Sequence, residues 1–318
     1  LNSMRYLLID YGASFFKSVI YNTEELSYSK YYTIPSPFTK DALITKEALK
    51  KIIKKIIKNY SEIDGIISCS ILGGGYHDNL YYSWKQKSKY KLKNCIISGL
   101  FEESSSFHLH SHHGGNQINI GILGYINKIP YYSNLGDTNC VVKALSLKKN
   151  QIALNLGTGS QLILTSDGDT KIYSHFPAGR SFHVFNELFE SLNLNIFKLF
   201  KTISKEDVIS SSLKINLNNF PQSRDYFQGG FISEINEGKF SYKNLLGSLI
   251  KSFILQYQNI ISERPKDEIL LCGGISSKLE ILKDLFQFYY PENKVLLIES
   301  NHPLTFIGLS AFIKELLI

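Results

Sequence analysis

The chain has 318 residues, of which 43% are hydrophobic and 20% charged, so it can bury a large core and is neither a disordered segment nor a fibrous protein. Its 35 basic and 28 acidic side chains give a formal charge of +7, which attracts any polyanion and does not single out nucleic acid. Four scattered cysteines form no C-x-x-C pair, which favours a reducing, cytoplasmic compartment, and no apolar run reaches the roughly 18 residues that cross a bilayer.

The N-terminal part of the chain is predicted to open with a β-hairpin, followed by a helix and a buried strand. Residues 5–10 form a short apolar run that Gly12 breaks before residues 15–21 resume it. Between residues 46 and 60, isoleucines recur at helical spacing and six lysines take the other positions. We interpret this segment as an amphipathic helix docked by its isoleucine face, with its lysines in water, and not as a membrane or nucleic-acid surface. Residues 65–70 are typical of a buried strand.

The segment between residues 81 and 115 has no clear period and contains a histidine run, His108–His113. Histidines at alternating positions resemble a metal site, but no cysteine or carboxylate at ligand spacing accompanies them, so we favour a loop there. Further along, Gly136 breaks the pattern and Asp137 follows it. We expect Asp137 to be the N-cap of a helix over residues 137–145.

At Gln151 the opening pattern begins again. Residues 152–156 and 161–165 predict two strands around the turn Gly157-Thr158-Gly159-Ser160, which repeats the first hairpin. The remaining predicted elements are helices over residues 185–200 and 245–261, strands over residues 269–272 and 295–298, a Gly273-Gly274 turn after the first of these strands, and a last helix from about Pro303. The chain is therefore predicted to form two α/β halves, residues 4–148 and 149–318.

Three glycine turns are candidates for nucleotide binding. Two of them, Asp10-Tyr11-Gly12-Ala13-Ser14 and Asn155–Ser160, combine a strand, a glycine and a hydroxyl side chain. Glycine lets backbone N–H groups approach phosphate oxygens closely, and the hydroxyl adds a neutral donor. Each is an ordinary hairpin turn by itself, but the occurrence of two such turns predicts a binding site for a triphosphate. The third, Gly273-Gly274, would let backbone approach a flat ligand such as adenosine. A Walker loop and a complete G-x-G-x-x-G are both absent from the sequence.

Asp137 has two possible roles that its spacing leaves open. It could simply cap the helix, a contribution of about 1 kcal/mol. It could also be a general base that accepts the proton of a bound alcohol while a phosphoryl group leaves ATP. His77 follows three glycines after the strand over residues 65–70, at the end of a strand where α/β proteins place ligand contacts.

The order of these motifs resembles that of the actin-like ATPase and sugar-kinase superfamily and, more narrowly, the FGGY carbohydrate kinases, especially their sedoheptulokinase-like branch. The segments that carry the resemblance are, in chain order, LLIDYGASFFKSVI, SCSILGGGYH, SNLGDTNCVVKAL, ALNLGTGSQL and LLCGGISS. A weaker similarity lies in FPAGRSFHVFNELFESL. The five main motifs extend from residue 7 to residue 277, so the resemblance covers most of the chain.

The resemblance implies an α/β fold with duplicated actin-like, ribonuclease H-like ATPase domains that flank a deep cleft. Residues 4–148 would carry the sugar side and the catalytic aspartate, and residues 149–318 the nucleotide side. It implies ATP-dependent phosphorylation of a small sugar or polyol, a ketose or heptose first of all, with ATP and Mg²⁺ and without a nucleic-acid or membrane partner. A nucleotide- or sugar-binding regulator without transfer activity, and an actin-like filament or chaperone ATPase, are the alternatives on the same fold.

Residue by residue, the resemblance makes Asp137 the catalytic base and Asp10 the Mg²⁺ ligand. The residues that would hold ATP and its phosphates are Asp10, Gly12, Ser14, Lys17, Gly157, Thr158, Gly159, Gly273, Gly274 and Ser277. His77 and Trp84 would contact the sugar. Where these kinases usually have Asp-Xaa-Gly-Thr, this chain has Ala13-Ser14 after Gly12, and where they often have Gly-Gln-Met-His it has Gly74-Gly75-Tyr76-His77. These departures leave the identity of the sugar open.

Overall fold

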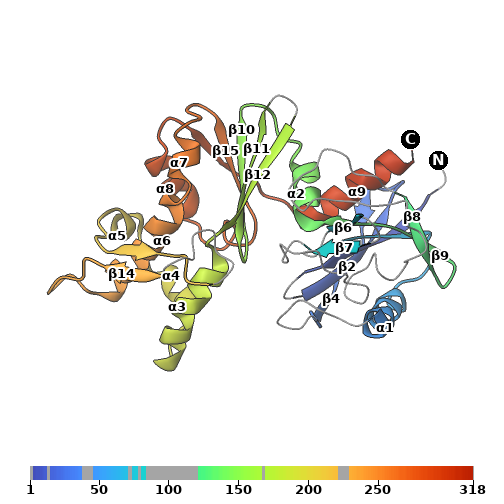
Figure 1. The fold of residues 1–318 in the computed structure, drawn as a ribbon, viewed down its shortest axis with the longest axis horizontal. Coiled ribbons are helices and arrows are strands. Elements are labelled where there is room, and N and C mark those ends of the chain that lie inside the picture. The colour runs from blue at the N-terminus through green and yellow to red at the C-terminus, as the bar shows by residue number, and fades with distance from the viewer. Residues whose placement is uncertain are drawn as a thin grey trace. The chain divides into compact units, whose positions relative to one another are not determined.

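The computed structural model describes residues 3–12, 15–37, 46–70, 74–77, 80–83, 121–166, 169–220 and 229–317. The chain divides into two compact units, coloured along the chain in Figure 1. Unit 1 comprises Leu1–Ser146 together with Ser300–Ile318, and unit 2 comprises Leu147–Glu299. The boundary expected near residue 148 lies close to the point where the chain leaves unit 1. The division differs from the expected one at the end of the chain, since residues 300–318 pack in unit 1 and not with the second half.

Unit 1 is built on a mixed sheet with the strand order β3-β2-β1-β5-β9-β8, and β4 also pairs with β2. The predicted hairpin consists of β1 and β2, which are antiparallel, and β5 and β9 run parallel to β1 on its other side. The bounds are β1 (Arg5–Tyr11), β2 (Phe15–Asn22), β3 (Ser27–Tyr28), β4 (Tyr32–Pro35), β5 (Gly65–Ser70), β8 (Ile122–Ile126) and β9 (Ile129–Gly136). A separate two-stranded sheet pairs β6 (Gly74–His77) with β7 (Leu80–Ser83).

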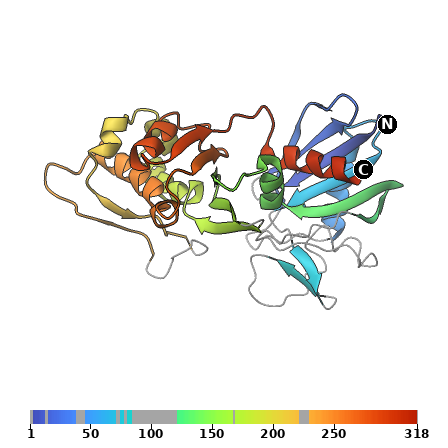
Figure 2. The ribbon, with the colours of Figure 1, turned by 90° about the horizontal axis from the view of Figure 1, so that it is seen from above.

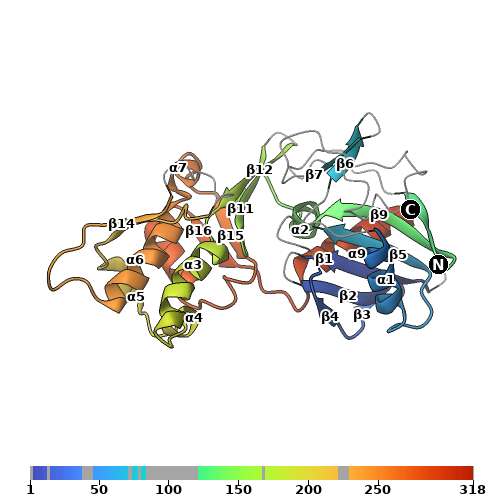
Figure 3. The same cartoon turned by 60° about the horizontal axis from the view of Figure 1, so that its bottom comes forward.

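Alternating side chains of β1 enter two different cores, as the period of a strand requires. Leu7 and Ile9 pack with helix α1 (Lys46–Ile57), whose isoleucine face is buried and whose lysines from Lys50 onward are exposed, as expected. Leu8 packs on the opposite face with helices α2 (Asp137–Leu145) and α9 (Leu304–Leu316) (Figure 3). All six residues of β5 are buried, which is typical of a strand covered on both faces.

Helix α9 belongs to unit 1 although it follows the last strand of unit 2. Its Phe306, Leu309 and Phe312 are buried with Leu8 of the sheet, and Figure 2 shows it (red) beside α2 (green). A side chain at Gly308 would collide with the backbone of Cys140 on α2, so glycine is what permits this close crossing. The sequence predicted a last helix from about Pro303, but the prediction of a helix does not specify which of two sheets it covers.

Unit 2 repeats the strand arrangement of unit 1 in a sheet with the order β12-β11-β10-β15-β16. Three antiparallel strands, β10 (Gln151–Leu156), β11 (Ser160–Ser166) and β12 (Asp169–Phe176), are followed by β15 (Glu268–Cys272) parallel to β10 and β16 (Lys294–Leu297) parallel to β15. In both units the first strand of a hairpin is central and pairs in parallel with a later strand. The duplication expected from the repeated glycine hairpin is therefore visible in the topology.

The helical part of unit 2 is more broken than the sequence predicted. The bounds are α3 (Gly179–Ser191), α4 (Ile196–Phe200), α5 (Lys205–Ile209), α6 (Tyr242–Leu255), α7 (Gln258–Ile261) and α8 (Leu282–Tyr289), with a small hairpin of β13 (Lys214–Asn216) and β14 (Phe231–Ser233). The helix expected over residues 185–200 is two helices, because Asn193 has a left-handed backbone (φ 57°) and Asn195 caps α4 through its side chain. Among the described helices, none is long and apolar enough to cross a membrane.

Candidate functional site

Two carboxylates lie at the carboxyl edge of the parallel strands in unit 1. Asp10 of β1 pairs with Cys69 of β5, and Cys69 pairs with Leu135 of β9, two residues before Asp137. Because neighbouring strands are spaced by about 4.8 Å, β1 and β9 are about 10 Å apart. The side chains of Asp10 and Asp137 are both half-buried. The carboxyl ends of such strands are the usual place for a ligand in an α/β sheet.

Asp137 opens helix α2 but does not cap it. The N-cap is Gly136, so the sequence prediction was wrong by one position, and Asp137 stands in the first turn, where the helix dipole favours a negative charge. Its Oδ1 accepts hydrogen bonds from the amide nitrogen of Thr138 (2.6 Å) and from Thr138 Oγ1 (3.2 Å). Burial, and after it the charge of Asp10, raise the pKa of Asp137 to about 6, against the lowering effect of Thr138. The carboxylate is therefore ionised at pH 7 and basic enough to take a proton.

Asp10 is held by groups from three other elements. Thr305 on α9 donates its Oγ1 proton to Asp10 Oδ2 at 3.1 Å, and Lys17 faces Asp10 across the β1–β2 hairpin. Burial raises the pKa of Asp10, while Lys17, Thr305 and Cys69 lower it. Thr305 was missed in the sequence, where no local pattern connects it with a strand almost three hundred residues away.

The pair of carboxylates fits a magnesium ion. Mg²⁺ prefers oxygen ligands and is usually held by one or two carboxylates, with water and substrate phosphates completing its shell. The charges of Asp10 and Asp137 raise each other's cost of ionisation, as the pKa of Asp137 shows, and a cation would remove that cost. Among the described residues no group of three or more His, Cys, Asp or Glu side chains forms a ready cage. The arrangement suits Mg²⁺ brought in with a nucleotide.

The first glycine turn has a structural reason for its glycine. A Cβ at Gly12 would lie 2.8 Å from the carbonyl oxygen of Phe15, so the tight hairpin excludes a side chain there. Ser14 lies outside the described residues, and its expected contact with phosphate stays a prediction. Lys17 is half-buried opposite Asp10, which places its charge beside the carboxylate.

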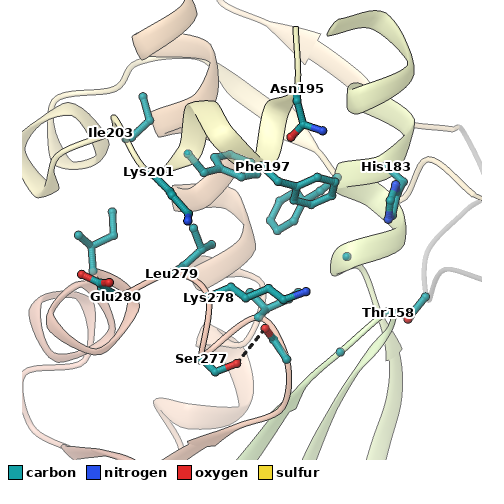
Figure 4. Close-up of a pocket in the computed structure, with 17 residues that line it drawn as sticks. Thr158, His183, Asn195, Phe197, Lys201, Ile203, Ser277, Lys278, Leu279 and Glu280 are labelled. Atoms are coloured by element: carbon teal, nitrogen blue, oxygen red, sulfur yellow. Dashed lines mark hydrogen bonds between the residues drawn. The ribbon is translucent and has the colours of Figure 1, made fainter. Parts of the chain in front are cut away.

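Unit 2 contains a cavity of about 920 Å³ that brings together two of the predicted turns (Figure 4). Gly157 and Thr158 of the β10–β11 turn line it on one side, and Gly274 and Ser277, which follow β15, line it on another. Ser277 Oγ donates to the carbonyl oxygen of Gly274 at 3.2 Å. Thus four residues predicted to bind ATP, from segments more than 110 positions apart, share one cavity.

Helix α3 fixes the second turn. The amide nitrogens of Gly179 and Arg180, in the first turn of α3, donate to the carbonyl oxygens of Gly157 (3.1 Å) and Thr158 (2.7 Å). Within the turn, the amide of Gly157 donates to the carbonyl oxygen of Gly159 at 3.2 Å. Helix α3 begins in FPAGRSF, the segment with the weaker family similarity.

The glycines of the two predicted turns in unit 2 fall into two classes. Gly273 has φ +92°, and a Cβ there would lie 2.6 Å from the carbonyl oxygen of Leu156, so the fold itself requires glycine. Gly157, Gly159 and Gly274 have no left-handed φ. A Cβ at Gly157 would come no closer than 3.4 Å to the protein, and at Gly159 or Gly274 it would meet nothing within 4 Å. At these three positions no close packing contact requires glycine.

The cavity also has lining residues that the sequence did not single out. Phe197 and His183 meet edge to face, with ring centroids 5.0 Å apart, and Lys201 and Lys278 bring positive charge to the lining. Figure 4 shows His183 near Thr158 and the side chain of Lys278 close to Ser277. No sequence motif marked these residues as ligands. Three of them come from α3, α4 and the segment after α4, which lie beside the turns only in the folded unit.

The residues expected to bind sugar are only partly within the described chain. His77 is the last residue of β6 and pairs with Leu80 of β7, but its side chain is outside the described set. Trp84 and the His108–His113 run also lie outside the described residues. Their expected roles stay predictions.

No family model matches the chain, and no curated protein has a significant sequence match. Solved structures do match. The gluconate kinase from Lactobacillus acidophilus has a TM-score of 0.63 at 10% identity, with 99% of this chain and 90% of that chain covered. The ligand-bound xylulose kinase from the same organism gives 0.62 at 11% identity (98% and 89%), and the Plasmodium falciparum glycerol kinase with ADP gives 0.57 at 10% identity (97% and 89%).

The fold is that of these sugar kinases. The expected actin-like α/β fold is thereby confirmed. The ethanolamine utilization protein EutJ from Carboxydothermus hydrogenoformans also matches, with a TM-score of 0.50 at 11% identity and 98% and 91% of the chains covered. At such identities the likeness establishes the fold, and the function must be argued from the site.

Proposed function

We propose that this protein transfers the γ-phosphoryl group of ATP to a hydroxyl of a small sugar or polyol. The observation that carries the proposal is Asp137, a half-buried carboxylate at the carboxyl edge of the parallel strands with a pKa of about 6. A pKa just below neutrality suits a general base. A protein that only binds nucleotide does not need a general base.

In this proposal the cavity of unit 2 takes the nucleotide. Its volume of about 920 Å³ is within the range of small-molecule and cofactor sites. The bare backbone at Gly157, Gly159 and Gly274 supports close approach by phosphate or ribose. Thr158 and Ser277 add hydroxyl groups, and Lys278 adds a positive charge.

Asp10 would hold the magnesium ion, which when bound neutralises charge on the transferring phosphoryl group. Asp137 is the general base in this proposal. Oδ1 is engaged by Thr138, and no hydrogen bond within the described residues engages Oδ2, so we assign proton acceptance to Oδ2. The sugar oxygen gives its proton to Oδ2 and forms a bond to the γ-phosphorus, while the bond from that phosphorus to the bridging oxygen breaks and ADP leaves.

The acceptor is proposed to be a ketose or heptose, as the resemblance implies, with His77 and Trp84 on the sugar side. Gluconate, xylulose and glycerol kinases share the fold, so sugar acids and small polyols belong in the same test. We place the activity in the cytoplasm, where ATP is available, and this fits the absence of paired cysteines among the three described ones.

A panel of ketoses, heptoses, aldonic acids and polyols tests the proposal. With Mg²⁺ and ATP, at least one compound should increase ADP release about tenfold or more, and phosphorus NMR should show a new phosphate monoester. Asp137→Asn is the matched control, because it keeps Oδ1 as an acceptor for Thr138. If calorimetry shows ATP binding but no compound stimulates ADP release, the protein is a nucleotide-binding regulator on this fold, and the kinase proposal is wrong.

A further inference from the structure

The two oxygens of Asp10 face different neighbours. Oδ2 accepts the hydrogen bond from Thr305 Oγ1 at 3.1 Å. Oδ1 is the atom that a Cβ at Gly12 would approach to 3.9 Å, so it lies toward the first glycine turn. Oδ2 is therefore engaged by Thr305, and Oδ1 lies toward the turn where a phosphate is predicted to bind.

Several contacts fix the position of Thr305. It stands in the first turn of α9, followed by the buried Phe306, which stacks on Tyr31 with ring centroids 5.6 Å apart. Glu315 at the end of α9 forms an ion pair with Lys143 of α2. Together with the close crossing at Gly308, these contacts leave the hydroxyl of Thr305 little freedom relative to β1.

The charges around Asp10 explain why a fixed donor matters. Asp137 repels an ionised Asp10, since each carboxylate disfavours ionisation of the other. Lys17, on the neighbouring strand, attracts Asp10. The thiol of Cys69 also hydrogen-bonds Asp10. The hydrogen bond from Thr305, whose helix is packed against the sheet, adds a fixed donor that favours one orientation of the carboxylate.

We propose that Thr305 is a positioning residue for the metal site: its hydroxyl holds Asp10 Oδ2 so that Oδ1 is presented to a divalent cation. The inference rests on the proposed function, in which Asp10 is the metal ligand. Outer partners that hold a ligating carboxylate typically change metal affinity by about 10- to 100-fold when removed. Helix α9 is the first element of unit 1 after β16 of unit 2, so the residue that orients Asp10 lies a few positions after the point where the chain returns to unit 1.

Thr305→Val tests this, because valine keeps the shape of threonine and removes only the hydroxyl. Binding of Mn²⁺ to the full chain, alone and with ATP, is followed by electron paramagnetic resonance. We expect the dissociation constant for Mn²⁺ to rise about tenfold in Thr305→Val and to return to within about twofold of wild type in Thr305→Ser. In steady-state assays the apparent KM for Mg²⁺ should rise, while kcat at saturating Mg²⁺ should stay within about threefold of wild type.

Ser310→Ala is the matched control, since it removes a hydroxyl from the same helix whose partner is Tyr28 and not a carboxylate. It should leave Mn²⁺ binding unchanged. Unfolding in urea checks that each variant is folded, and Thr305→Ala replaces Thr305→Val if valine prevents folding.

Asp10→Asn distinguishes a failure of the inference about Thr305 from a failure of the proposed metal site. If Asp10→Asn abolishes Mn²⁺ binding and Thr305→Val does not weaken it, the inference about Thr305 is wrong and the metal site stands. If Asp10→Asn binds Mn²⁺ like wild type, the metal site is wrong, and the inference fails with it.

Discussion

At Asp137, two effects act in the same direction. Removal from water disfavours the charged carboxylate, and the neighbouring charge of Asp10 disfavours it further, which together outweigh the two hydrogen bonds from Thr138 and bring the pKa to about 6. The sequence indicated Asp137 as a candidate through Gly136 and the start of a helix. It could not indicate the shift in pKa, which depends on Asp10, a residue from a different strand.

The pKa of Asp137 predicts the acid limb of the pH–rate profile. A general base must be ionised, so kcat/KM for the sugar should fall tenfold per pH unit below the pKa of Asp137. That pKa is about 6 without Mg²⁺, and it should be lower in the assay, where Mg²⁺ neutralises the charge of Asp10. The profile of the remaining activity in Asp137→Asn should lack this limb. A wild-type limb that stays unchanged in the variant would assign the titration to another group.

The same shift predicts an effect on stability. The pKa of Asp137 is raised on folding from 3.8 to about 6, so the folded state binds the proton more tightly than the unfolded state. The resulting stabilisation is present below pH 3.8 and is lost as the pH rises through 6. At pH 7 without Mg²⁺, Asp137→Asn should therefore be more stable than wild type by on the order of 1–3 kcal/mol. Urea unfolding at pH 7 and at pH 4 measures this, and an equal difference at both values would contradict it.

At the scale of elements, both glycine hairpins follow from local sequence, because an apolar run, a glycine and a second apolar run suffice to specify them. The helix predicted over residues 185–200 was wrong in its continuity, since the left-handed Asn193 and the capping Asn195 end one helix and start another. Asparagine at both positions was the available signal. The roles of the individual glycines could be assigned only from the structure. The close approach of Phe15 to Gly12 and of Leu156 to Gly273 shows that these two glycines are required by the fold.

The two classes of glycine predict different outcomes for alanine. Gly159→Ala and Gly274→Ala should keep the stability within about 1 kcal/mol and weaken binding of Mg-ATP about tenfold or more, because a methyl group enters the space left for the ligand. Gly273→Ala should instead destabilise unit 2 by about 2 kcal/mol or more, through its φ of +92° and the contact with Leu156. Calorimetry and urea unfolding distinguish these cases. Unchanged ATP affinity in both Gly159→Ala and Gly274→Ala would remove these turns from the nucleotide site.

For the whole molecule, the repeated hairpin was enough to predict two α/β halves and their division near residue 148. The return of α9 to unit 1 was not predictable in the same way, since it depends on the fit of Gly308 against Cys140 and on an apolar face that either sheet could accept. The assembly of the cavity was predictable for the glycine turns. The presence of His183, Phe197 and Lys201 in the cavity was not predictable. No sequence motif marked these residues as ligands, and they reach the cavity only because their segments pack beside the turns in the folded unit.

Nucleotide binding should slow hydrogen exchange in several segments that are far apart in the sequence. The cavity is formed within unit 2 by the turn at residues 157–158, the start of α3, the segment of residues 195–203 and the segment of residues 274–281. Hydrogen exchange with a non-hydrolysable ATP analogue should therefore slow in these four segments, and little change is expected in β14. Protection confined to unit 1 would contradict the placement of the nucleotide.

The most direct test of the central claim is the turnover of Asp137→Asn with the best acceptor from the panel. We expect kcat to fall by roughly 10²–10⁴, the usual effect of losing a general base, while the affinity for Mg-ATP stays within about threefold of wild type. A kcat within about threefold of wild type, in a variant that folds and binds Mg-ATP normally, would contradict the claim that Asp137 is the base.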